Sequence, residues 1–227
     1  AKDSGIIWHS QGAGKSLTMV WLAQWIRENI ENSRVVIITD RDELDKQITN
    51  GLRNSRVLAS GQPNKYYHAE SRNDLLTKLD SADPWLITTL IHKFGVSTNG
   101  QKEDYKKGKR SPESVLEDIA NHIDTYFPGF KAKGNVFVFV DECHRTQGGV
   151  MNRAMKKIMG EDVMLIGFTG TPLLKKGDRK TMSSQQNFGR YIHTYRFNEA
   201  VEDGVVLDLR YEARDVDQHL NNPKALD

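Results

Sequence analysis

The sequence predicts an α/β domain whose mostly parallel central sheet is covered by helices on both faces. Short strand-like apolar runs alternate with helical stretches along the 227 residues, which is the pattern of consecutive strand–helix–strand units. The run at residues 136–140 is apolar throughout, as expected of a central strand covered on both sides. A glycine-rich turn at residues 9–16 separates a strand-like run from a helical one, so that the turn faces the ligand-binding edge of such a sheet.

The remaining elements follow from the same periodicities and from turn signals. The expected strands cover residues 6–8, 34–39, 56–59, 85–89, 136–140, 164–169 and 207–213. The expected helices cover residues 15–31, 42–52, 72–80, 112–126, 151–159 and 198–203. No internal repeat interrupts this order, and the length suits one large domain.

The first helix has a well-defined apolar side. Its members recur at the spacing of one helix face, namely Met19, Leu22, Ala23, Ile26 and Ile30. Trp21 and Trp25 lie beside this side, and we expect both to pack in the core rather than to stack on a nucleobase.

Composition sets further bounds on function. The formal net charge of +2 is too small to indicate nucleic-acid binding by itself, so any such surface must be local. The single cysteine excludes an internal disulfide framework and suits a reducing cytoplasm. The sequence holds no apolar run long enough to predict a membrane span.

The segment His9-Ser10-Gln11-Gly12-Ala13-Gly14-Lys15-Ser16 predicts a phosphate-binding loop. The common pattern is G-x-x-x-x-G-K-[ST], and His9 stands where that pattern has its first glycine. Gly12 and Gly14 allow the backbone to approach a phosphate closely, and the following helix directs its N-terminal N–H groups at the anion. We expect Lys15 to reach the β- and γ-phosphates and Ser16 to bind Mg²⁺. The nucleotide-binding residues would be Gln11, Gly12, Ala13, Gly14, Lys15, Ser16 and Leu17.

The alternative for this segment is a glycine-rich turn in which Lys15 and Ser16 follow by chance. The strand before it and the helix after it favour the phosphate loop.

Asp141 and Glu142 directly follow the apolar run at residues 136–140. The carboxyl end of a central parallel strand is where α/β sheets bind ligands. We expect Asp141 to hold Mg²⁺, directly or through water, and Glu142 to orient and deprotonate an attacking water. Lys15, Asp141 and Glu142 would then be the catalytic set, whereas an ordinary solvated acidic turn is the alternative.

Cys143 and His144 come next. A thiol nucleophile with a histidine base is one interpretation, but neighbours on an extended segment point to opposite sides. We therefore expect a structural Cys143. His144 would sense the γ-phosphate, contact Gln11, or be a structural histidine, and these interpretations stay open.

Three motifs occur in one order: the phosphate loop, Asp141-Glu142-Cys143-His144, and Thr169-Gly170-Thr171-Pro172. This arrangement resembles the first RecA-like domain of superfamily 2 helicases and translocases. The segments at residues 39–47, 88–94 and 141–147 narrow the likeness to the motor (restriction) subunit of type I restriction-modification enzymes. The resemblance extends from residue 6 to about residue 211.

The resemblance implies a RecA-like P-loop NTPase domain that uses ATP and Mg²⁺ to move double-stranded DNA, with cleavage by a separate nuclease domain. It implies methyltransferase and specificity subunits as partners and a cytoplasmic location. His144, Thr169 and Thr171 would couple the γ-phosphate state to domain movement. The residues expected near the DNA backbone are Thr39, Arg41, Thr89 and Lys93, although strand-end capping is an equal alternative for the threonines.

We expect residues 1–227 to be a single domain of a larger protein, without the family's nuclease domain and without its second RecA-like domain. Such a piece would bind nucleotide weakly and hydrolyse it slowly. Two basic segments, residues 97–111 and 174–186, are expected to be solvated loops, or alternatively to follow DNA phosphates.

Two other functions remain open at this point. One is another superfamily 2 motor, such as a remodeller-like translocase or an RNA helicase. The other is a nucleotide-gated switch that binds triphosphate and barely hydrolyses it, against which Glu142 argues because a switch has less need of a base.

Overall fold

The computed structural model describes residues 4–40, 42–55, 57–58, 61–94, 112–143, 148–174 and 183–208. In this part of the chain seven strands form one sheet in the order β3-β4-β2-β5-β6-β1-β7. Every pair of neighbouring strands is parallel. The strands are β1 (Gly5–His9), β2 (Ser33–Thr39), β3 (His68–Ala69), β4 (Leu86–Leu90), β5 (Asn135–Val140), β6 (Met164–Thr169) and β7 (Arg190–Tyr195).

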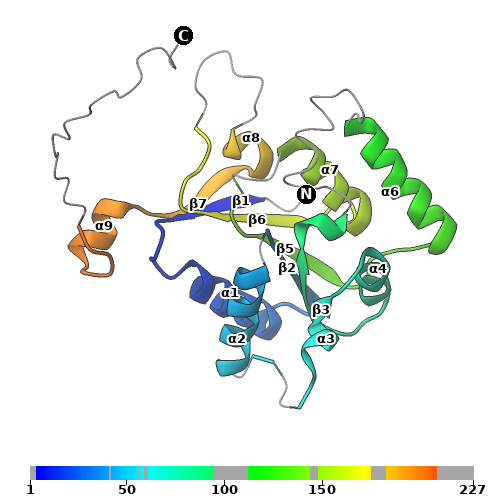
Figure 1. The fold of residues 1–227 in the computed structure, drawn as a ribbon, viewed down its shortest axis with the longest axis horizontal. Coiled ribbons are helices and arrows are strands. Elements are labelled where there is room, and N and C mark those ends of the chain that lie inside the picture. The colour runs from blue at the N-terminus through cyan, green and yellow to red at the C-terminus, as the bar shows by residue number, and fades with distance from the viewer. Residues whose placement is uncertain are drawn as a thin grey trace, which may run out of the picture.

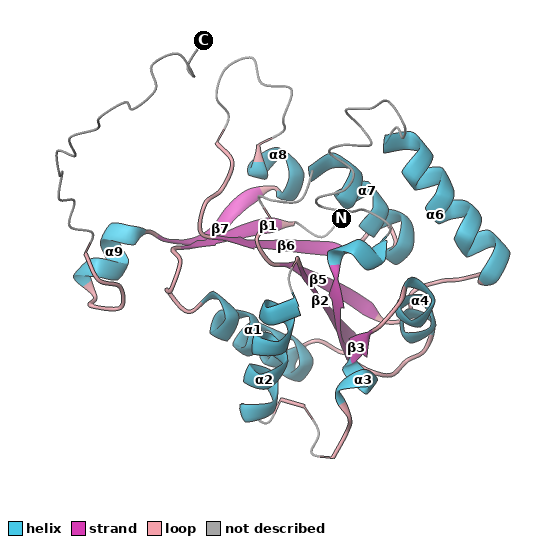
Figure 2. Ribbon diagram, viewed as in Figure 1, coloured by secondary structure: helices cyan, strands magenta, loops and turns pink. Residues whose placement is uncertain are grey.

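Helices cover both faces of the sheet, as the sequence predicts (Figures 1 and 2). One face carries α1 (Lys15–Asn29), α2 (Asp42–Asn54) and α3 (Asn64–Tyr67). The other carries α4 (Arg72–Asp80), α6 (Pro112–Tyr126), α7 (Gly148–Met159) and α8 (Ser184–Phe188). The 3-10 helix η1 (Ile91–Phe94) follows β4, and α9 (Phe197–Glu202) follows β7.

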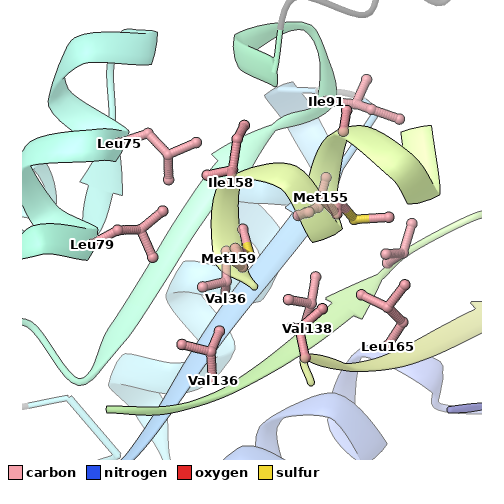
Figure 3. Close-up of a cluster of buried hydrophobic side chains, with 14 of the residues drawn as sticks. Val36, Leu75, Leu79, Ile91, Val136, Val138, Met155, Ile158, Met159 and Leu165 are labelled. Atoms are coloured by element: carbon pink, nitrogen blue, oxygen red, sulfur yellow. The ribbon is translucent and has the colours of Figure 1, made fainter. Parts of the chain in front are cut away.

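Alternation along the central strands divides their side chains between two cores. Val136 and Val138 of β5 face α4, α6 and α7, while Phe137 and Phe139 face α1 and α2. Figure 3 shows the first of these cores, in which Met155 and Ile158 of α7 lie over the strand valines. Because both faces of β5 are buried, this strand is apolar from Val136 to Val140, which is why the sequence locates it well.

Arg34 is a buried residue of β2 that joins three segments. Its guanidinium donates hydrogen bonds to the carbonyls of Lys78, Leu79, Ser81, Pro84 and Lys133. Burial lowers the pKa of this group, against a smaller effect of Asp83. Since its partners are carbonyl oxygens, it satisfies the carboxyl end of α4 and the approaches to β4 and β5 together.

Two predicted strands are wrong where the structure describes them. Val57 and Leu58 donate their backbone N–H groups to the Leu52 carbonyl, at 3.0 and 3.3 Å, and so close a turn on the end of α2. Leu207 and Asp208 lie outside any strand, and residues 209–213 lie outside the described residues. The sheet edges are instead formed by β3 and β7, neither of which we predicted.

The expected core packing of two tryptophans is also wrong. Trp21 and Trp25 are 60% and 56% exposed. The buried side of α1 consists of Met19, Val20, Ala23 and Ile26. The two tryptophans and Leu17 lie on the opposite, exposed side of the helix. The apolar periodicity of α1 therefore locates its buried face correctly, but apolar character continues beyond that face.

Candidate functional site

The phosphate loop joins the end of β1 to the start of α1. Gly12 and Gly14 have φ angles of 81° and 79°, a left-handed conformation that glycine adopts without a steric penalty. Gly14 is the N-cap residue of α1, where no side chain caps the helix and the first turn holds no acid. The N-terminal N–H groups of α1 are thus directed at the loop, which is the arrangement that binds phosphate.

The acidic pair lies at the end of β5, as predicted. Asp141 is 5% exposed, and its backbone N–H donates to the Ile38 carbonyl at 2.9 Å. Glu142 has a φ of 47°, which is uncommon for a residue other than glycine and often marks a functional position. Its carboxylate Oε1 lies 3.9 Å from Lys15 Nζ. The phosphate loop and the acidic pair therefore meet at one place.

A cavity of about 930 Å³ contains this meeting point. The predicted residues that line it include Gln11, Gly12, Gly14, Lys15, Ser16, Leu17, Asp141 and Glu142. Ala13 is not among the lining residues, but it belongs to the same turn, because its N–H donates to the Ser10 carbonyl at 3.1 Å.

Burial raises the pKa of Asp141 to about 6, and the neighbouring charge of Glu142 adds to this effect while Lys15 opposes it. A buried carboxylate beside a second carboxylate is stabilised by a cation. Oxygen donors are the ligands that Mg²⁺ prefers, and Ser16 supplies a hydroxyl on the same cavity. The residues present therefore fit a magnesium ion, which Asp141 and Ser16 would hold.

The Thr169-Gly170-Thr171 turn packs against the phosphate loop. A Cβ on Gly170 would lie 3.2 Å from both the Gln11 backbone N and the His9 backbone O, and 3.4 Å from Lys15 Nζ. Thr169 is buried, and its Oγ1 accepts a hydrogen bond from the Thr171 N–H at 3.1 Å. A change in the loop would thus reach this turn directly, and the coupling role of both threonines stays a prediction.

The residues expected near DNA have different surroundings. Thr39 and Thr89 end or nearly end two neighbouring strands, and both side chains are fully buried. Lys93 is half-buried in η1. Arg41 and His144 lie outside the described residues, as do residues 97–111 and 175–182 of the two basic segments, so DNA contact remains a prediction.

Cys143 is 1% exposed, and burial strongly raises the pKa of its thiol. A Cβ on Gly167 would lie 2.8 Å from its Sγ, so Gly167 leaves the space that the thiol fills. These observations support the structural interpretation of Cys143, since a nucleophilic cysteine needs an accessible thiolate.

Sequence reasoning missed part of the cavity wall. The wall also includes residues of α2, namely Lys46, Gln47, Ile48, Asn50, Gly51 and Asn54. The spacing of Gln47, Asn50 and Asn54 places three amides on one side of that helix. This periodicity was available in the sequence, but it does not indicate which helix packs beside the phosphate loop.

Sequence reasoning also missed the contacts of His9 with β7. His9 as a residue is 8% exposed, and its ring Nε2 lies 2.9 Å from Nδ1 of His193. Because β7 was not predicted, nothing in the sequence indicated this pair.

Within the described residues, no helix is both long and apolar enough to cross a lipid bilayer.

A parallel sheet with a phosphate loop after one strand and paired carboxylates after another defines an α/β nucleoside-triphosphate-binding domain. The comparison with known families makes this class more specific. The chain belongs to the SWI2/SNF2 ATPase family, whose sequence profile matches residues 1–227.

Curated relatives are similar along nearly the whole chain. A putative type I restriction enzyme endonuclease subunit of Methanocaldococcus jannaschii is 30% identical over 220 residues, covering 96% of this chain and 18% of that protein. The HindI endonuclease subunit of Haemophilus influenzae is 27% identical over 222 residues, covering 92% of this chain and 18% of that protein. The motif-based resemblance to this group is thereby confirmed, and the chain spans about a fifth of the length of these relatives.

Solved structures share the fold. The type ISP restriction-modification enzyme LlaBIII, bound to DNA, superposes with a TM-score of 0.52 at 15% identity, covering 89% of this chain and 14% of that one. A nuclease-deletion mutant of LlaGI in complex with a DNA substrate mimic gives a TM-score of 0.52 at 12% identity. The superposition covers 90% of this chain and 19% of that one. The predicted RecA-like fold is confirmed by these likenesses and by the parallel sheet.

Proposed function

We propose that this chain is the ATP-hydrolysing motor domain of a type I restriction endonuclease and that it moves double-stranded DNA before a separate nuclease domain cleaves it. The observation that carries the proposal is the convergence of Lys15 and Glu142 at 3.9 Å on a cavity that Ser16 and Asp141 also line. A phosphate-binding group and a candidate base thus share one ligand-sized space.

The chain's residues divide the chemistry between them. The loop N–H groups and Lys15 bind the phosphates and hold the γ-phosphate in line for attack. The Glu142 carboxylate orients the attacking water and accepts its proton. Ser16 and Asp141 would hold Mg²⁺, which neutralises phosphate charge when it is bound.

The relatives support the finer part of the proposal. Several carry the name of a type I restriction endonuclease subunit, and two enzymes of the same fold are described in complex with DNA or a DNA mimic. On this basis the partners are double-stranded DNA, the methyltransferase and specificity subunits, and a second RecA-like domain that completes the ATP site. Thr169 and Thr171 would transmit the γ-phosphate state. The carboxyl ends of β2 and β4, which carry the buried Thr39 and Thr89 and are followed by Arg41 and Lys93, would approach the DNA backbone as the domains close.

The test compares the full-length protein with its Glu142→Gln variant in single-turnover ATP hydrolysis. Loss of the base is expected to slow hydrolysis about 100-fold or more, with ATP binding retained. Glu113→Gln is the matched control, because Glu113 lies on α6 in a solvent-exposed ion pair with Arg153. Equal rates in parent and Glu142→Gln would favour the nucleotide-gated switch instead.

A second measurement distinguishes a double-stranded DNA translocase from other superfamily 2 motors. Double-stranded DNA is expected to stimulate hydrolysis, and the full-length protein is expected to displace a triplex-forming strand from linear DNA. Stimulation by RNA alone would assign the chain to another class of superfamily 2 motor.

A further inference from the structure

His9 occupies an unusual position, since it stands where phosphate loops commonly have their first glycine. It is the last residue of β1, immediately before the loop. The residue is nevertheless buried, at 8% exposure. A side chain at this place must therefore be accommodated by neighbouring structure, and that structure is the edge strand β7.

Two rings of β7 enclose the His9 ring. The His193 ring meets it edge-on with a centroid distance of 5.0 Å, and the Tyr195 ring does so at 5.9 Å. The parallel register pairs His9 with Tyr195, and residues two apart on a strand share a face, so that all three rings lie on one side of the sheet. The His9 Nε2 to His193 Nδ1 distance of 2.9 Å is that of a hydrogen bond.

Counting hydrogens on the ring nitrogens assigns the direction of this bond. His9 Nδ1 is buried and has no hydrogen-bond partner among the described residues. If His193 donated, a neutral His9 would carry its hydrogen on that buried Nδ1, where an unsatisfied donor is costly. In the other arrangement His9 Nε2–H donates to His193 Nδ1 and only a lone pair is buried. A neutral pair with His9 as donor is therefore favoured.

The bond is one of several that hold the start of the loop to β7. The Ser10 N–H donates to the Tyr195 carbonyl at 3.0 Å, and the Ser10 carbonyl accepts from the Ala13 N–H at 3.1 Å inside the loop turn. On the opposite side, the His9 backbone O is tightly packed against Gly170. A shift of His9 would consequently displace both the loop turn and the Thr169–Thr171 turn.

We propose that His9 and His193 form a positioning pair in which β7 holds the phosphate loop in its binding geometry through the imidazole–imidazole hydrogen bond. The pair acts through the loop and touches no reacting atom. This inference rests on the proposed ATP site, and it predicts an effect on ATP affinity that exceeds any effect on folding. Because His193 is exposed, its replacement removes the bond without a cavity in either core.

The test measures KM for ATP, kcat and Tm in the full-length protein. His193→Leu removes the acceptor and is expected to raise KM about tenfold, which is the size expected from one hydrogen bond, with kcat and Tm near the parent values. His193→Asn places an amide oxygen near the position of Nδ1 and is expected to return KM to within about twofold. His122→Leu is the matched control, since it breaks a 2.6 Å histidine–asparagine contact on α6 away from the loop.

The outcomes separate cleanly. An unchanged KM in His193→Leu, or a raised KM that His193→Asn does not restore, would overturn the positioning pair. A lowered Tm with parental KM would reduce the pair to a structural contact and would overturn it as well. If the parent protein itself bound no ATP, the proposed function would fail rather than the pair.

Discussion

Lys15 Nζ and Glu142 Oε1 lie 3.9 Å apart, with side-chain exposures of 12% and 23%. At this distance the two charges attract each other but form no short hydrogen bond. Lys15 is thus held near the acid without being locked to it. A triphosphate entering the cavity would compete with the Glu142 carboxylate for Lys15.

Replacement of Lys15 tests the phosphate-binding assignment. Lys15→Ala is expected to weaken ATP binding at least about 100-fold, because a cation that pairs with phosphate contributes several kcal/mol in a partly buried site. Titration of a fluorescent ATP analogue into the full-length protein measures this, with circular dichroism to confirm the fold. Lys65→Ala on the exposed surface of α3 is the control. Undiminished ATPase activity in Lys15→Ala would remove the site assignment.

Asp141 is expected to destabilise the metal-free protein. Its pKa of about 6, against an ordinary value of 3.8, means that the folded state binds this proton more tightly than the unfolded state does. The contribution of Asp141 to stability is therefore fully present below pH 3.8, and it is lost as the pH rises through about 6. At pH 7.5 the charged group costs about 3 kcal/mol by this reckoning.

Asp141→Asn should therefore raise Tm by several degrees at pH 7.5 in EDTA, and calorimetry would detect the rise. The same substitution should abolish ATP hydrolysis if Asp141 holds Mg²⁺. Added Mg²⁺ and ATP should stabilise the parent more than the variant. A variant with lower Tm in EDTA would show that Asp141 has a structural partner that outweighs its buried charge.

Arg34 is expected to matter for stability and not for nucleotide binding. Arg34→Met retains much of the side-chain volume but removes the donor of five hydrogen bonds to backbone carbonyls. The expected loss is about 3 kcal/mol or more in the free energy of unfolding, since hydrogen bonds to a charged group contribute most when they are buried. Urea denaturation measures it, and Lys65→Met is the control. A loss below about 1 kcal/mol would mean that water or rearranged backbone replaces the guanidinium.

The central strands could be predicted from sequence because both of their faces are buried. Residues 136–140 and 164–168 carry no polar side chain, and β5 and β6 lie at almost the same ranges, 135–140 and 164–169. The edge strand β7 could not be predicted from the sequence, because Ile192 and His193 are exposed. Its sequence also mixes polar and apolar residues without strict alternation. Its pairing with β1 also shifts register between Ile6 and Ile7, and a regular period of two does not predict such a shift.

In the candidate site, too, some residues could be predicted from the sequence and others could not. Lys15, Ser16 and Asp141 were identifiable because each belongs to a motif at the end of an apolar strand. The amides of α2 and the His9–His193 contact depend on which elements lie side by side, and that is determined by tertiary packing. The exposure of Trp21 likewise depends on the absence of a neighbour over that side of α1 in the described structure.

The last prediction concerns pH and His9. Burial lowers the pKa of His9 from its ordinary value of 6.5, and the charges of His193 and Lys15 lower it further. The titratable groups around the ring are therefore Lys15 from α1 and His193 and Tyr195 from β7. Below pH 6.5 the unfolded state binds this proton more readily than the folded state does. His9 consequently contributes a stability that is present above pH 6.5 and is lost as the pH falls.

His9→Gln retains a donor near the position of Nε2 but has no titratable ring. Between pH 7.5 and 5.5 the parent should lose more free energy of unfolding than His9→Gln, by at most about 1.4 kcal/mol for each pH unit below 6.5. Urea denaturation of both proteins at several pH values measures the difference. Because the other titratable groups are common to both proteins, their contributions to the pH dependence cancel in the comparison. Parallel curves would show that His9 takes up its proton equally well in the folded and unfolded states, which its burial against β7 should prevent.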